Sequence, residues 1–184
     1  DSNSGYMVLG AIVEADSRET YYDFIENHIT RPLQMANTGC DSHILVTANR
    51  AQGYSDSDTV ADVIDMSIPF SAGGLISTVE DLFRWDQALY TTELLPQSLL
   101  DRLFMPMAPI PAPNGAEEAY GYGWVIGEQF NQPRIWHRGS IEGFLSEIDR
   151  YPDHHDTIIV LGNREDVDLP GVSSEIARMV LEEE

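Results

Sequence analysis

The chain has 184 residues, of which 42% are hydrophobic, enough for one domain with a sizeable core. Its 31 acidic residues against 10 basic ones give a net charge of −21, which disfavours nucleic acids and anionic membranes as partners and suits a protein kept soluble in high salt, as in halophiles. Every basic residue is arginine, so this chain cannot supply a lysine general base or a Schiff-base lysine.

The sequence carries no sign of a membrane span or a secretion signal. No apolar run approaches the roughly 20 residues needed to cross a bilayer, and the first residues lack the charged-then-apolar pattern of a leader, so we expect any export signal to lie upstream. The single cysteine, Cys40, cannot form a disulfide within the chain. We expect no metal and no cofactor.

Two helices are predicted at the start of the chain. Apolar residues at helical spacing predict a helix over 4–15, and because that run is apolar on nearly every side, we expect it to be buried on most of its surface. The residues before it, Asp1, Ser2 and Asn3, are typical of a helix cap. A second helix over 21–29 should end before Pro32, and 36–70 reads as mostly irregular.

The stretch SAGGLISTVEDLFRWDQALY, residues 71–90, gives the clearest local signal. Ser77 followed by Glu80 predicts a capping box, with Trp85, Ala88 and Leu89 on one face of the helix that follows. Another helix is expected after Pro96. Residues 107–119 hold three prolines without a period and predict a loop or boundary.

From residue 120 the apolar period changes to two. We predict strands at 120–127, 133–139, 144–151 and 156–163, and an amphipathic helix after Pro170 and Gly171. The expected fold class is α+β, an antiparallel sheet packed with helices. Residues 1–119 would form its mainly helical part, and 120–184 the antiparallel strands plus the C-terminal helix of the same domain.

Four stretches resemble, in order and spacing, the second half of the serine β-lactamase-like family, which includes class C β-lactamases, DD-carboxypeptidases (penicillin-binding proteins) and esterases. They are SNSGYMVLGAIVE (2–14), ITRPLQMANTG (29–39), SAGGLISTVEDLFRW (71–85) and WHRGSIEGFLSEIDRYPDHHDTIIVLGN (136–163). The resemblance implies a β-lactamase/transpeptidase-like fold whose N-terminal half is absent from this chain. It suggests an extracytoplasmic location and a serine acyl-enzyme mechanism on a β-lactam, D-Ala peptide or ester.

In members of that family three motifs meet in the active-site cleft, and this sequence matches them only in part. Asn3 matches the asparagine of the YxN motif, but Asp1 stands where its tyrosine is expected. His137 and Gly139 match the HxG found in esterase-like members. The SxxK motif, which carries the nucleophilic serine and its lysine base, cannot be present because the sequence has no lysine.

The resemblance implies a role for each matching residue. The Asn3 amide would hold a substrate carbonyl or amide, and Gly139 would let the strand approach the nucleophile. The Ser140 N–H would be an oxyanion donor. His137 would project into the cleft beside substrate contacts from Arg138 and Ser140. The bland alternatives stay open here: a helix cap for Asn3 and a structural role for His137.

Three functions are therefore weighed. The chain is the C-terminal portion of a serine hydrolase for a small-molecule or peptide substrate, inactive alone for want of SxxK. Alternatively it is a non-catalytic module derived from that fold, whose unpaired sheet edge and apolar face lead to self-association or pairing with the missing N-terminal half. The third possibility is an unrelated acidic α+β domain. HxG instead of KxG favours, by resemblance, esterase-like or peptidase-like chemistry.

Overall fold

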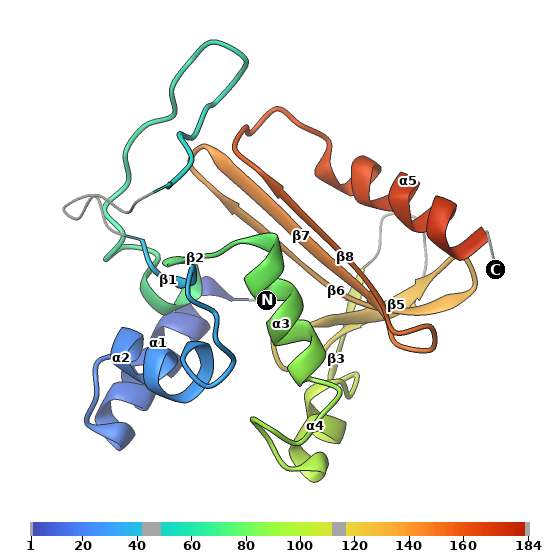
Figure 1. Cartoon of the computed structure of the whole chain (residues 1–184), viewed down its shortest axis with the longest axis horizontal. Helices are drawn as coiled ribbons and strands as arrows, with labels where there is room; N and C mark the ends of the chain where they lie inside the picture. Colours follow the sequence, from blue (N-terminus) through green and yellow to red (C-terminus); the bar gives the residue numbers. More distant parts are fainter. Residues whose placement is uncertain (1, 42–48, 112–116, 183–184) are drawn as a thin grey trace.

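The structure consists of a group of helices and an antiparallel sheet, with α3 between them (Figure 1). The computed structural model describes residues 2–41, 49–111 and 117–182. Its first elements are α1 (Asn3–Ser17), α2 (Tyr21–Ile25), the π-helical turn η1 (Glu26–Thr30), β1 (Gly39–Cys40), the 3-10 turn η2 (Phe70–Ala72), β2 (Leu75–Ile76), α3 (Val79–Ala88) and α4 (Gln97–Leu103). The sheet and last helix are β3 (Ala108–Pro111), β4 (Glu117–Tyr120), β5 (Val125–Gln129), β6 (Gln132–Ile141), β7 (Phe144–Tyr151), β8 (Asp156–Gly162) and α5 (Leu169–Glu182). Within these ranges no helix could cross a bilayer.

The six strands β3 to β8 form one antiparallel meander in which each strand pairs with the next along the chain. Helices cover both faces of the sheet. Neighbouring residues of β7 point to opposite faces, and two of them contact different helices. Asp149 accepts a hydrogen bond from Ser173 of α5, whereas Arg150 pairs with Asp86 of α3. This arrangement confirms the predicted α+β fold.

The core lies mainly between the sheet and the helices α3 and α4. Leu89, Leu100, Trp124 and Ile135 form a buried cluster there, and the Trp85 ring stacks on Trp124 with their centroids 5.4 Å apart. The predicted apolar face of α3 is therefore confirmed. A second cluster, on the other face, joins the sheet to α5.

Helix α1 forms where the sequence predicts it, but the expectation that most of its surface is buried is wrong. Val8, Leu9 and Ile12 are 59%, 52% and 55% exposed. The helix packs against η2 and α2, and Gly10 comes so close to η2 that a Cβ would lie 2.1 Å from the Ser71 Oγ. A run that is apolar all round predicts a helix but does not say how many of its sides have a partner.

The cap of α3 differs by one residue from the predicted box. Thr78, not Ser77, is the N-cap, and its hydroxyl accepts the Asp81 N–H at 3.3 Å. Asp81 is buried because its carboxylate also accepts the Asn37 N–H at 2.7 Å. This contact between distant segments favours Thr78 over Ser77 as the cap residue, and Glu80 is left exposed.

The region around residue 110 also differs from the expectation. The predicted loop 107–119 contains β3 and most of β4, and the predicted strand 120–127 is interrupted by the connection between β4 and β5. Helix α5 starts at Leu169, so that Pro170 lies in its first turn, where proline is tolerated. Strands β6, β7 and β8 confirm the other three predictions. The division at residue 119 stays a prediction, and β4 runs across that position.

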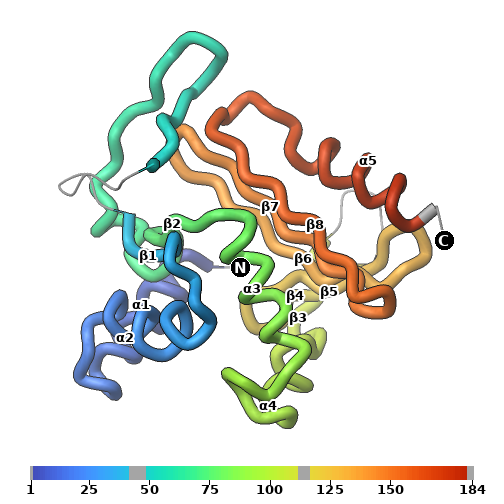
Figure 2. Tube along the Cα trace, viewed as in Figure 1, coloured from blue at the N-terminus to red at the C-terminus, as the bar shows by residue number. Residues whose placement is uncertain are grey.

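The irregular segment predicted over 36–70 is confirmed for most of its described residues, and one end of it is anchored on the sheet. Figure 2 shows the part after residue 49 lying against the turn from β6 to β7. Gly143 in that turn has a φ of +81°, and its backbone packs closely on Gly53. The Gly143 N–H donates to the Glu165 carboxylate at 2.6 Å. The loop therefore covers one end of the β6–β7 hairpin.

Candidate active site

His137 lies on β6 and points to the same face of the sheet as the core residue Ile135, two positions earlier. Its ring is half-buried and meets the side chain of Tyr120, the last residue of β4. The Tyr120 hydroxyl lies 3.0 Å from the His137 Nε2, and the two rings are T-shaped with centroids 5.9 Å apart. The contact joins two strands that are not neighbours in the sheet.

Helix α1 reaches the same place from the other side. The Tyr6 hydroxyl lies 3.3 Å from the Tyr120 hydroxyl, which brings the first turn of α1 against the sheet. Asn3 is three residues before Tyr6 and therefore lies on the same helical face. The N-cap of α1 is Ser2, whose hydroxyl accepts the Gly5 N–H at 3.2 Å, so that the cap does not require the Asn3 side chain.

Burial controls the protonation of this group of side chains. It lowers the pKa of His137, an effect that a backbone hydrogen bond with Arg138 partly offsets. Burial, reinforced by the hydrogen bond between the Tyr120 and Tyr6 hydroxyls, raises the pKa of Tyr120 well above its usual value. At neutral pH the site therefore holds a neutral imidazole next to a protonated phenol.

The end of β6 that carries the HxG residues has one open edge. Residues Gln132 to Trp136 pair with β5, whereas the pairing with β7 continues to Ile141. From 137 to 141, therefore, β5 does not cover the strand, and Ser140 is exposed. A Cβ on Gly139 would lie 2.4 Å from the Ser146 Oγ of β7. Backbone groups along such an edge can pair with an extended ligand.

Arg138 lies on the other face of β6 and points away from His137. Its guanidinium pairs with buried Glu147 at 3.2 Å and stacks on the Trp136 ring at 4.8 Å. Arg134 also pairs with the Glu147 carboxylate, at 2.9 Å. Burial and the nearby Asp149 raise the pKa of Glu147, whereas the two arginines oppose this. This placement does not support the predicted substrate contact for Arg138.

The structure therefore brings His137 and the first turn of α1 together and separates Arg138 from them. The predicted tyrosine position, Asp1, lies outside the described residues. Tyr6 and Tyr120 are not among the site residues predicted from the sequence. The helical spacing from Asn3 could have indicated Tyr6, but Tyr120 is brought to His137 only by the sheet topology. Across the described ranges, no cluster of three or more His, Cys, Asp or Glu residues is placed to hold a metal ion.

An antiparallel meander covered by α5 on one face, with an asparagine-bearing helix beside an HxG strand on the other, defines an α+β domain of the β-lactamase/transpeptidase type. The family comparison agrees with this class. The chain belongs to the beta-lactamase family, whose model matches residues 2–178.

Similar proteins support this assignment. The chain is 32% identical over 181 residues to penicillin-binding protein 4* of Bacillus subtilis (strain 168), a match that covers 90% of this chain and 40% of that protein. The structure of D-amino acid amidase from Ochrobactrum anthropi SV3 matches with a TM-score of 0.83 at 25% identity, covering 100% of this chain and 57% of the amidase. An octameric penicillin-binding protein homologue from Pyrococcus abyssi has the same fold, with a TM-score of 0.85 at 22% identity over 98% of this chain and 42% of that one. The chain thus spans between two fifths and three fifths of the length of these proteins.

Proposed function

We propose that this chain is the C-terminal portion of a β-lactamase-like serine hydrolase. It would supply two walls of the active site, namely the HxG edge of β6 and the first turn of α1. The observation that carries the proposal is the placement of His137, neutral and half-buried at the open edge of β6 and linked through tyrosines to the asparagine-bearing end of α1. The nucleophilic serine and its base would come from a segment bearing SxxK, because this chain has no lysine.

Each wall would contribute to acyl transfer in its own way. A serine hydroxyl is a weak nucleophile until a base removes its proton, so the chain alone should not form an acyl-enzyme. Once the serine attacks, the Ser140 N–H on the open edge of β6 would stabilise the oxyanion. The Asn3 amide would hold the substrate, and neutral His137 would orient it or take part in proton transfer. Similarity to a penicillin-binding protein and a D-amino acid amidase supports an amide or ester next to a D-amino acid as substrate.

Reconstitution tests the proposal. We expect the purified chain alone to leave nitrocefin, p-nitrophenyl acetate and D-phenylalanine amide intact, and a mixture with the SxxK-bearing N-terminal portion of a family member to hydrolyse at least one of them. His137→Ala should lower the rate of the mixture by about 10²-fold or more. His28→Ala, a change at an exposed histidine of η1, is the matched control and should leave the rate unchanged. Turnover by the chain alone that His137→Ala abolishes would contradict the proposal.

A second candidate function is a binding module that acts without chemistry. The observation that favours it is the exposed apolar side of α1, formed by Val8, Leu9 and Ile12, because surfaces of this kind mark association sites. The Pyrococcus abyssi homologue is described as octameric. Under this alternative the chain would self-associate or pair with an N-terminal half, and the reconstituted mixture would form a complex that hydrolyses none of the three substrates.

A further inference from the structure

We infer that Ser146 is a positioning residue and that its hydroxyl holds the segment that brings the nucleophilic serine to β6. The inference rests on the proposed function, because that segment would come from outside this chain, which has no lysine for an SxxK motif. It concerns a residue of β7 that is not among the site residues predicted from the sequence. Its basis is the place of Ser146 in the sheet and the surroundings of its hydroxyl.

Ser146 lies in a row of residues that runs across three strands of the sheet. Gly139 of β6 is opposite Ser146 on one side, and Leu161 of β8 is opposite it on the other. Ser146 points to the α3 face, because it is four residues before Arg150, which pairs with Asp86 of α3. The row therefore lies on the same face as the proposed active site.

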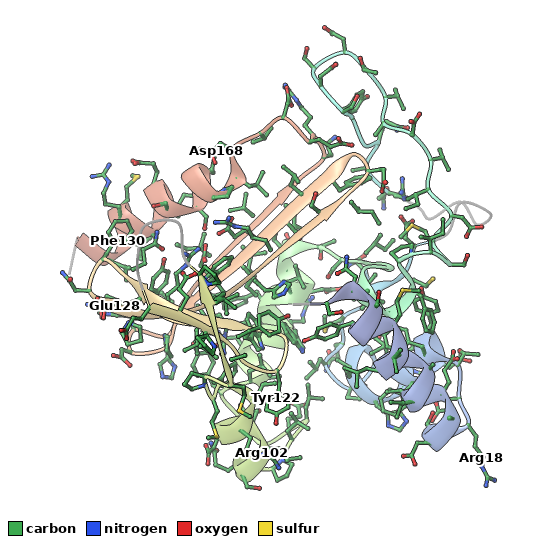
Figure 3. All side chains as sticks on the ribbon, turned by 180° about the vertical axis from the view of Figure 1, so that it is seen from behind. Arg18, Arg102, Tyr122, Glu128, Phe130 and Asp168 are labelled. Carbon is green, nitrogen blue, oxygen red and sulfur yellow. The ribbon has the colours of Figure 1, made fainter. Side chains whose placement is uncertain are left out.

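Little of this chain covers the row. Gly139 is exposed and Leu161 is 40% exposed, whereas Arg150, further along β7, is almost fully buried beside α3. Figure 1 shows α3 crossing the sheet nearer to the β7–β8 turn than to the β6–β7 turn. Helix α5, which starts just after the labelled Asp168 in Figure 3, contacts β7 and β8 from the opposite face. An exposed leucine beside an exposed glycine on a sheet face is typical of a contact surface.

The hydroxyl of Ser146 is available to an incoming group. Within residues 2–41, 49–111 and 117–182, no side chain or backbone group makes a hydrogen bond with its Oγ. This oxygen lies over Gly139, so closely that a Cβ on Gly139 would overlap it. A hydroxyl donates and accepts, so it can bond either an N–H or a carbonyl group of another segment. A chain that approaches β6 at Gly139 therefore meets this hydroxyl.

The position of Ser146 favours the nucleophile-bearing segment over the substrate as its partner. The substrate would lie along the open edge of β6, on the side that β5 leaves uncovered. Ser146 belongs to β7, which pairs with β6 on the other side. A segment that brings a serine to Gly139 comes over the row and contacts Ser146 and Leu161 there. Relatives are long enough to supply such a segment, since this chain covers 40% of penicillin-binding protein 4*.

Titration calorimetry of the full 184-residue chain with the SxxK-bearing N-terminal portion used for reconstitution tests the role of Ser146. Ser146→Ala should raise the dissociation constant of the complex about five-fold, the equivalent of one net hydrogen bond. Ser146→Thr keeps the hydroxyl and should bind like the wild type. Ser174→Ala is the matched control, because it removes the α5 hydroxyl that bonds Gln129, and it should leave the dissociation constant unchanged.

Urea unfolding of the chain alone separates this role from a structural one. Because the Ser146 hydroxyl has no hydrogen-bond partner in the described part of the chain, Ser146→Ala should be as stable as the wild type. A clear loss of stability would assign the hydroxyl to the fold and overturn the inference. Unchanged binding by Ser146→Ala would also overturn it, and a raised KM of the mixture at unchanged binding would assign Ser146 to the substrate.

The measurement also separates the inference from the proposed function. Weaker binding by a stable Ser146→Ala chain supports the inference even where the mixture hydrolyses nothing, an outcome that counts against the proposed function alone. Hydrolysis by a mixture in which Ser146→Ala binds like the wild type supports the proposed function and overturns the inference. A wild-type chain that binds no N-terminal portion overturns both.

Discussion

At the scale of single residues, a buried ion pair joins α3 to β7. Asp86 and Arg150 are both almost fully buried, and Thr157 donates to the same carboxylate at 2.8 Å. The guanidinium also lies over the Tyr90 and Phe104 rings, at 4.6 and 4.8 Å from their centroids. A cation held this way cannot be resolvated in place if its anion is removed.

Asp86→Ala should therefore lower the free energy of unfolding by roughly 3–5 kcal/mol. Replacing both partners, as Asp86→Leu with Arg150→Met, should restore much of this loss, because no uncompensated charge is left. Glu175→Ala, which removes an exposed pair with Arg178, is the control and should have little effect. Urea denaturation of the four proteins provides the measurement. A double variant less stable than Asp86→Ala would contradict the argument.

His137 should make the stability depend on pH. Since burial lowers its pKa in the folded chain below the ordinary 6.5, the unfolded chain binds more protons, and stability falls as the pH drops below that value. His137→Gln removes this contribution, so its unfolding free energy should fall less between about pH 7.5 and pH 5.5 than that of the wild type. Denaturant titrations at the two pH values measure the difference. Parallel losses in both proteins would count against a depressed pKa.

At the scale of elements, the turn from β6 to β7 depends on a glycine. Gly143 has a φ of +81°, and a Cβ there would lie 2.7 Å from the Gly53 Cα. Gly143→Ala should lower the unfolding free energy by about 1–3 kcal/mol and speed proteolysis of the covering loop after residue 49. Gly39→Ala in β1, where a Cβ meets nothing within 4 Å, is the matched control. Equal stability of the two variants would show that the loop yields to the added methyl group.

The elements also show how far the sequence could predict the fold. The apolar period of two located β6, β7 and β8, because the side chains of these strands point regularly to alternate faces of the sheet, as that pattern assumes. It failed at β3, an edge strand in which Pro109 and Pro111 obscure the pattern, and at the four-residue strand β4 next to it. The sequence could identify His137 from the HxG motif. It could not identify Tyr120, because the position of Tyr120 beside His137 depends on how β4 packs in the sheet. Local signals likewise misplaced the α3 cap, because Asn37 binds Asp81 from a distant segment.

At the scale of the whole molecule, two features act against each other. The exposed apolar side of α1 favours association, but a net charge of −21 repels a second copy of the chain. Salt screens that repulsion while leaving the apolar contact intact. Self-association of the chain should therefore strengthen as salt is added, opposite to the behaviour of an interface made of ion pairs.

Sedimentation velocity at low and high salt measures this balance. In the wild type, the fraction of associated chain should increase with salt concentration. Ile12→Glu places a charge in the middle of the apolar side of α1 and should keep the chain monomeric in both conditions. Val63→Glu adds the same charge at a position that is 78% exposed outside any helix or strand, so it should behave like the wild type. If both variants lose association equally, net charge alone governs it and α1 is not the contact surface. If Ile12→Glu alone does, the exposed side of α1 formed by Val8, Leu9 and Ile12 is where a second copy binds.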